Sequence, residues 1–246
     1  MNEILNLVQE LVETQNERAE HLQDEFVAEA NEFDRWGEIN ESTDESIRFT
    51  EGGFERDGRF VPGQVCEVDT EAAEFDPELA ELSNELNTWI CQSEDMSCAV
   101  AGQTMAVNQL EKGFHSEQEL IEIGEENNWY NDGTYASDVG KIAEYMGMEI
   151  EQIHEVPAEK LTLANDAETK VLATVDSTLL HYPESFKRCQ PDHVVQVLRV
   201  ENTPQGEVVI LNDSGHENGR GAVYPMEVFA KAYSGDITTI RKGASA

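Results

Sequence analysis

The sequence predicts an α+β fold in which helices come first and an antiparallel sheet comes second. Helical patterns and helix caps dominate the chain up to about residue 147, and short apolar or alternating runs bounded by turn residues occupy the rest. Segregation of helices from strands along the chain is typical of this class. With 246 residues, the chain is long enough for one sizeable core and a smaller appendage.

An acidic extension over residues 1–80 is expected to precede the main domain at 81–246. Residues 2–35 carry apolar side chains at helical spacing, which predicts an amphipathic helix. Residues 36–77 are rich in Gly, Asp, Glu, Ser and Thr, which predicts a long loop or partly disordered linker. The first 90 residues hold 25 acidic and 5 basic residues, so the extension is more strongly charged than the rest.

Start and stop signals predict the helices of the main domain. Proline is favourable in the first turn of a helix, Ser116-x-x-Glu119 is a capping box, and Gly147 is a stop signal. Small residues after Cys98 would allow a helix there to pack closely. The expected helices begin at Pro77, with apolar positions as far as Ile90, and span 98–110, 120–127 and, from a cap at Thr134 or Ser137, the residues through Tyr145.

Strand signals occupy the second half of the chain. Each run is apolar or β-branched and is bounded by turn chemistry, as at Thr203-Pro204-Gln205-Gly206. A sheet of neighbouring antiparallel strands is expected. The predicted strands are 148–153, 171–175, 194–200, 207–211 and 237–240.

The charge of the chain excludes some function classes. With 16 basic and 51 acidic residues the net charge is -35, so nucleic acid and anionic membranes would be repelled. Solubility or adaptation to a salty cytoplasm would account for the excess, and the acidic extension would also suit a basic partner. No run approaches the roughly 18–20 apolar residues that span a bilayer, and the first residues lack a basic signal-peptide region. A cytoplasmic location is expected, with signal-independent export left open.

The four cysteines are more consistent with thiol chemistry than with a metal site. They form no Cys-x-x-Cys pair, and no closely spaced histidines follow Cys91 and Cys98. In a cytoplasmic protein they should be reduced. His181 and His216 could be interpreted as metal ligands together with Asp213, but their spacing is not that of a metal motif. No cofactor and no metal is expected.

One ordered set of residues indicates a thiol hydrolase. Cys98 lies at the start of a predicted helix, where the helix dipole favours a thiolate. His193 begins one predicted strand and Asp213 comes after the end of the next, so antiparallel pairing would bring them together. Gln92 lies one loop upstream of the cysteine, where its amide could donate to an oxyanion. Taken singly, each residue has a structural interpretation as core cysteine, strand histidine or turn.

This set resembles the papain-like cysteine peptidases, and most closely the bacterial branch whose founders remove double-glycine leader peptides from bacteriocins. The tail adds to the resemblance: Val-Val-Ile-Leu-Asn-Asp-Ser-Gly over 208–215 is similar to the strand and turn of that branch, and 223–233 to its helix. Ser214 stands where proline is usual after the acid, and Ala99 where glycine is common. The resemblance covers about residues 86–241.

The resemblance implies a role for each residue of the set. Cys98 would be the nucleophile and His193 its general base and acid. Asp213 would orient the imidazole, with Asn212 as the alternative orienting residue. Gln92 would supply one oxyanion donor beside the backbone amide of Cys98. The implied function is a cysteine peptidase that hydrolyses a peptide or related acyl bond of a peptide or protein substrate, on a papain-like fold.

Two other functions and one further reaction stay open. The same triad would serve an acyltransferase in which an amine replaces water, and a retired peptidase fold could bind peptides without cleaving them. Gly52-Gly53 comes after a predicted acidic helix, which suggests a built-in leader that the enzyme itself would remove. Cys91, at the end of an apolar helix, is expected to be buried rather than nucleophilic.

Overall fold

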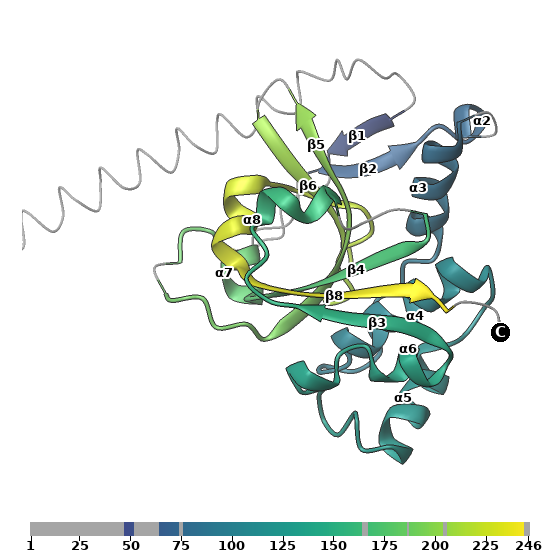
Figure 1. Cartoon of the computed structure of the whole chain (residues 1–246). Coiled ribbons are helices and arrows are strands. Elements are labelled where there is room, and N and C mark those ends of the chain that lie inside the picture. Colours follow the sequence, from purple (N-terminus) through teal and green to yellow (C-terminus); the bar gives the residue numbers. More distant parts are fainter. Residues whose placement is uncertain are drawn as a thin grey trace, which may run out of the picture. The chain divides into compact units, whose positions relative to one another are not determined.

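The computed structural model describes residues 47–51, 64–73, 76–163, 167–185, 187–203 and 206–243 (Figure 1). These residues all belong to one compact unit, Ser42–Ala246. The predicted helix at 2–35 and the Gly52-Gly53 pair lie outside the described residues.

The described strands form one antiparallel sheet in the order β1-β2-β7-β6-β5-β4-β8-β3. Helices occupy most of the chain between α3 and α6, and paired strands dominate the segment after α6, so the predicted α+β class is confirmed. The five predicted strands are all present, and β7 was not predicted. The strands are β1 (Ile47–Glu51), β2 (Gln64–Val68), β3 (Met148–Ile153), β4 (Thr169–Val175), β5 (His193–Thr203), β6 (Gly206–Asn212), β7 (Ala222–Pro225) and β8 (Tyr233–Lys242).

The prediction of a structureless linker over 36–77 was wrong for part of that range. The strands β1 and β2 pair with each other, and β2 joins β7 through the pair Val65↔Ala222 and a 2.9 Å backbone bond from Cys66 N to Gly221 O. A short helix α2 (Thr70–Ala73) comes next. Composition predicted a loop because the flanking residues are acidic or glycine-rich, whereas these strands are stabilised by backbone bonds to residues distant in sequence. The domain boundary at residue 80 stays a prediction.

The helices of the main domain begin largely where their caps predict. Asp76 caps α3 through the backbone amides of Glu78 and Leu79, and Ser116 caps α5 through the amide of Glu119. No helix among the described residues is both long and apolar enough to cross a membrane. The helices are α3 (Pro77–Asn87), α4 (Cys98–Glu111), α5 (Glu117–Glu126), α6 (Lys141–Tyr145), α7 (Ser177–His181) and α8 (Met226–Ala232), with 3-10 turns at Ala136–Asp138 and Ala158–Leu163.

The helix predicted from Thr134 or Ser137 through Tyr145 is interrupted. A 3-10 turn comes first, and α6 begins only after Gly140, whose φ is 99°. A Cβ atom at Gly140 would lie 2.7 Å from Ile150 Cγ2, so the backbone here passes too close to β3 for any side chain. The cap also differs from the prediction, because the side-chain oxygen of Gln103 accepts from the first amides of α6.

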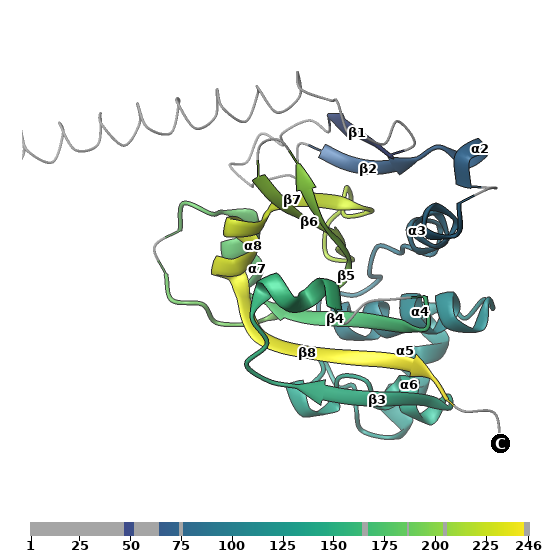
Figure 2. The ribbon, with the colours of Figure 1, turned by 45° about the horizontal axis from the view of Figure 1, so that its top comes forward.

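The helices α4 and α8 lie on different sides of the sheet (Figure 2), and each belongs to an apolar cluster formed with the strands. On one face, α4 packs on alternate residues of the strands, including Leu172 and Val194. On the other face, α7 and α8 pack against their sequence neighbours, such as Val171 and Val195. A Cβ atom added at Gly102 would lie 3.2 Å from the Leu172 side chain, so the small residues of α4 do permit close approach. The sheet thus supports the helix that begins with Cys98.

Candidate active site

Cys98 is the first residue of α4, and its surroundings favour the thiolate. The N-cap, Ser97, does not cap the helix with its side chain, because its hydroxyl donates to Glu117 Oε1 at 2.7 Å. The amides of the first helical turn are therefore left to attract a negative charge. Burial of the sulfur opposes ionisation, but the hydrogen bond and charge of His193, aided by the backbone amides of Val194 and Ala99, outweigh it and lower the pKa of Cys98.

The pKa values of the other three cysteines are raised instead of lowered. All four thiols are free, and Cys91 is exposed, in contrast to its predicted burial. Burial raises the pKa of Cys66 to about 12, and partial burial together with nearby carboxylates raises the pKa of Cys91 and Cys189. Since the thiolate is the nucleophile, Cys98 is the cysteine best suited to attack at neutral pH.

His193 lies between the sulfur and a carboxylate. Its Nε2 atom is 2.7 Å from Asp213 Oδ1, which leaves Nδ1 as the ring nitrogen that hydrogen-bonds with the Cys98 side chain. Burial disfavours the imidazolium, but the charge and hydrogen bond of Asp213, followed by those of Cys98, raise the pKa of His193 well above its usual value. The first residue of β5 and the residue after β6 thus meet, as the predicted hairpin requires.

Asp213 is fully buried and accepts hydrogen bonds at both carboxylate oxygens. Oδ1 also accepts from the Gly215 amide at 2.9 Å, and Oδ2 lies 3.0 Å from His181 Nε2. Burial would raise the pKa of Asp213, but the charge of His193 and the bonds from both histidines hold it far below the usual range. Trp89 Nε1 donates to the Asp213 carbonyl at 2.9 Å, so the backbone is held as well.

His181 was considered from the sequence only as a metal ligand with His216 and Asp213, and its hydrogen bond to the Asp213 carboxylate was not predicted. It lies 32 residues from Asp213 on a short helix, and nothing in its local Leu-Leu-His-Tyr context signals a partner. The ring of His216 lies 5.7 Å from that of His181, centroid to centroid. Among the described residues, no group of three or more His, Cys, Asp or Glu side chains could hold a metal ion.

Asn212, the alternative orienting residue, lies in a different hydrogen-bond network. Its Nδ2 atom donates to Glu85 O at 2.8 Å, and its Oδ1 accepts from the Gly221 amide at 3.1 Å. Adjacent residues of a strand point to opposite faces, which accounts for the divergence of Asn212 from Asp213. The amide therefore joins β6 to α3, and the carboxylate is the group beside the imidazole.

Gln92 is tied into the loop that precedes Cys98. Its Nε2 atom donates to Glu94 O at 2.8 Å and to Asp95 O at 3.0 Å, so both amide hydrogens have acceptors. Its Oε1 accepts from the Ser214 hydroxyl at 3.2 Å, and its backbone amide donates to Ser214 O at 2.8 Å. The loop before the nucleophile is thereby joined directly to the turn after Asp213.

Comparison with known proteins finds similar structures but no similar sequences. No protein-family profile matches the chain, and no curated protein sequence matches it. The peptidase domain of Streptococcus ComA, a bifunctional ABC transporter, is similar over 63% of this chain and 97% of its own, at 18% identity and a TM-score of 0.47. A double-glycine-motif protease from an AMS/PCAT transporter, solved with its leader peptide, is similar over 63% and 90%, at 20% identity and a TM-score of 0.46.

Identities of 18% and 20% with TM-scores of 0.47 and 0.46 carry no information on the chemistry of the site, which therefore depends on the residues themselves. What the residues offer is a nucleophilic thiol, an imidazole and a buried carboxylate in series.

Proposed function

We propose that this protein is a cysteine peptidase in which Cys98, His193 and Asp213 act as a catalytic triad. The observation that carries the proposal is the 2.7 Å contact between His193 Nε2 and Asp213 Oδ1, with the other ring nitrogen serving Cys98. The lowered pKa of Cys98 and the raised pKa of His193 together favour a thiolate–imidazolium pair. This pair is the reactive state of a thiol hydrolase.

In the acylation step, the Cys98 thiolate attacks the carbonyl carbon of the substrate, and the carbonyl oxygen becomes an oxyanion. As the tetrahedral intermediate collapses, the C–N bond breaks and His193 Nδ1 gives its proton to the leaving amine. The products of this step are a free amine, a neutral His193 and a thioester on Cys98. Asp213 remains ionised throughout and stabilises the imidazolium while it exists.

In the deacylation step, water replaces the amine. His193 Nδ1, now without a proton, removes one from the water as its oxygen attacks the thioester carbon. The C–S bond then breaks, a carboxylic acid leaves, and the thiolate–imidazolium pair is restored. The two half-reactions therefore use the same nitrogen in opposite directions.

The oxyanion would be stabilised by the backbone amide of Cys98 and by the Gln92 side chain. The start of α4 supplies the first donor, where Ser97 leaves the helix without a side-chain cap. The Gln92 amide would release Glu94 O or Asp95 O to supply the second. Such bonds form fully only when the substrate is present.

The substrate class that we propose is a peptide. One structural neighbour was solved with a leader peptide, and the reaction above requires only an acyl group that the thiolate can reach. To test this, a pool of peptides from a digested proteome is incubated with the wild type and with Cys98→Ala. We expect new peptide termini, detected by mass spectrometry, only with the wild type. No new termini with either protein would contradict peptide hydrolysis.

The thiolate–imidazolium pair has a separate test. Iodoacetamide at about neutral pH should alkylate Cys98 much faster in the wild type than in His193→Ala, because the variant lacks the base and the counter-charge. Peptide mapping assigns the adduct among the four cysteines. If Cys98 reacts equally fast in both proteins, the proposed activation is wrong and the fold is better regarded as a retired, peptide-binding one.

A further inference from the structure

Asp213 has a second histidine partner that the triad chemistry does not use. His181 is the last residue of α7, is largely buried, and places Nε2 3.0 Å from Asp213 Oδ2. The other oxygen, Oδ1, accepts from His193 and from the Gly215 amide. The neighbouring Leu180 is fully buried in the core, which fixes this end of α7 against the sheet.

The chemistry of the contact determines where the hydrogens are. An ionised carboxylate only accepts hydrogen bonds, so the Nε2 atoms of His181 and His193 both carry a hydrogen that points at Asp213. Donors on both oxygens fix the plane of the carboxylate, whereas donors on one oxygen would leave the group freer to turn about its Cβ–Cγ bond. A buried carboxylate oxygen that loses its donor is also destabilised in its charged form.

Three other titratable groups lie near Asp213 or His181: His216, Tyr224 and Cys91. His216 accepts a hydrogen bond at Nδ1 from the Asn218 amide at 3.0 Å. Tyr224 is fully buried, and burial together with the Asp213 charge raises the pKa of its phenol well above the usual value. Cys91 interacts with Asp213 only through charge, which raises the pKa of that thiol.

We infer that His181 is a positioning residue that holds the Asp213 carboxylate aligned and ionised, so that Cys98, His193, Asp213 and His181 form a four-residue line. The inference rests on the proposed function, because it assigns His181 a role relative to that triad. His181 acts through Asp213 and does not touch the substrate. Its removal should weaken the activation of Cys98 without removing any atom of the triad.

The test compares two substitutions of His181 that differ in hydrogen-bonding capacity. His181→Gln keeps an N–H donor at about the reach of Nε2, and His181→Phe keeps a ring but has no donor. Alkylation of Cys98 by iodoacetamide is followed at several pH values in the full-length chain. The matched control is His154→Phe, because His154 also contacts a carboxylate, Asp236, at 2.8 Å, but on the exposed surface.

We expect His181→Phe to slow alkylation of Cys98 about tenfold near neutral pH and to shift the acid limb of the profile to higher pH. We expect His181→Gln to recover most of the rate and His154→Phe to match the wild type. Equal rates for the wild type and His181→Phe would overturn the inference. So would a His181→Gln variant that is as slow as His181→Phe, because then the packing and not the donor would matter.

A measurement on the wild type covers the case in which His181→Phe does not fold. In ¹⁵N-histidine NMR spectra at neutral pH, His181 Nε2 should show a directly bonded hydrogen. An unprotonated His181 Nε2 would overturn the inference. The proposed function fails separately, if His193→Ala alkylates as fast as the wild type, and that outcome does not depend on either His181 variant.

Discussion

Replacement of Asp213 by asparagine removes the charge of the buried acid with little change of shape. The asparagine side chain would have nearly the same shape. In the wild type, His193 Nε2 and the Gly215 amide lie 2.7 and 2.9 Å from Asp213 Oδ1, and the Oδ1 atom of asparagine could accept from both. The orientation of the imidazole would be kept. The negative charge beside the imidazolium disappears, and so does the acceptor for His181 Nε2, because an amide nitrogen takes the place of Oδ2.

The cost of this loss can be estimated from the geometry. Opposite charges about 4 Å apart attract each other by about 4 kcal/mol at an effective dielectric constant of about 20. Loss of this attraction would lower the pKa of His193, because the charge of Asp213 raises it in the wild type. Formation of the reactive pair moves a proton from Cys98 to His193, so the population of the pair should fall by up to about 10³-fold. Both carboxylate and imidazole are buried, and water therefore compensates little of the loss.

The assay is the rate of Cys98 alkylation by iodoacetamide from about pH 5 to about pH 9, a range that brackets ordinary histidine and thiol values. We expect the Asp213→Asn rate near neutral pH to fall by at least about 10²-fold, which allows for partial compensation. The matched control is Asp236→Asn, which removes an exposed carboxylate that also contacts a histidine. If Asp213→Asn reacts within about threefold of the wild type, a difference of less than about 1 kcal/mol, the electrostatic reasoning is refuted.

Three further predictions concern the site and its support. Gly215→Ala should slow Cys98 alkylation about tenfold or more, because the added Cβ would lie 2.8 Å from His193 Cε1 and would displace the ring. In wild-type protein, the ratio of the alkylation rates of Cys98 and Cys91 should rise as pH falls, since the pKa of the first is lowered and that of the second is raised. Lys170→Met should lower the free energy of unfolding in urea by about 3 kcal/mol, because it leaves a buried carboxylate of α3 without its cation.

Each of these predictions has a control in the same chain. Gly113→Ala adds a Cβ with only ordinary contacts and should leave alkylation unchanged. The exposed Cys91 serves as the internal reference for the pH series, and a constant ratio would show that Cys98 is not activated. Lys141→Met removes an exposed ion pair and should cost at most about 1 kcal/mol. Equal losses for Lys141→Met and Lys170→Met would contradict the importance of burial.

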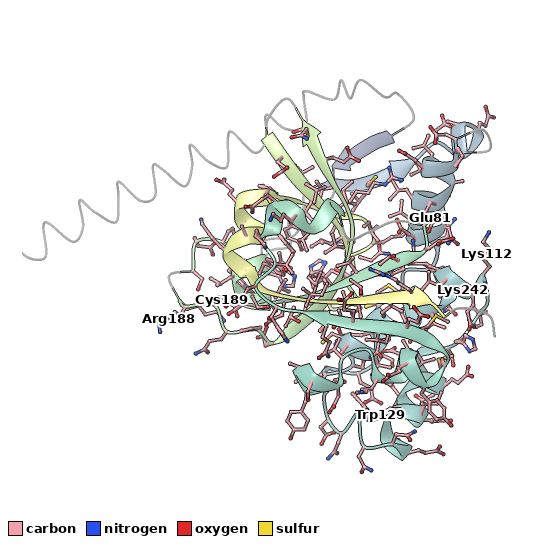
Figure 3. The ribbon with its side chains drawn as sticks, in the orientation of Figure 1. Glu81, Lys112, Trp129, Arg188, Cys189 and Lys242 are labelled. Atoms are coloured by element: carbon pink, nitrogen blue, oxygen red, sulfur yellow. The ribbon has the colours of Figure 1, made fainter. Side chains whose placement is uncertain are left out.

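The ion pair of Lys170 also shows what pattern reasoning cannot find. Lys170 is fully buried in β4 and donates to Glu85 and Glu81 of α3, the latter labelled in Figure 3. Burial raises the pKa of Glu85, and Lys170 opposes that rise. The predicted strand began at 171, and the carboxylates of a helix distant in sequence stabilise the buried lysine just before it.

The geometry of the candidate site was predictable to the extent that local signals determine it. The start of α4 can be inferred from its own sequence, and the ends of β5 and β6 carry His193 and Asp213 because hairpin strands run antiparallel. The choice between Asn212 and Asp213 cannot be inferred in this way. It depends on which face each residue takes, and the pairing of β5 with β6 shifts between Val197 and Arg199, an irregularity that no local pattern in the sequence indicates.

Two hydrogen bonds join the segment before Cys98 to the turn at Asp213 and limit how these two segments move apart. Gln92 N donates to Ser214 O, and Trp89 Nε1 donates to Asp213 O, so the segment before α4 is hydrogen-bonded to the turn that carries Asp213. A fluctuation that separates these two backbone segments must break both bonds. The rate of hydrogen–deuterium exchange at the backbone amide of Gln92 would therefore report how often the segment before α4 separates from the turn after Asp213.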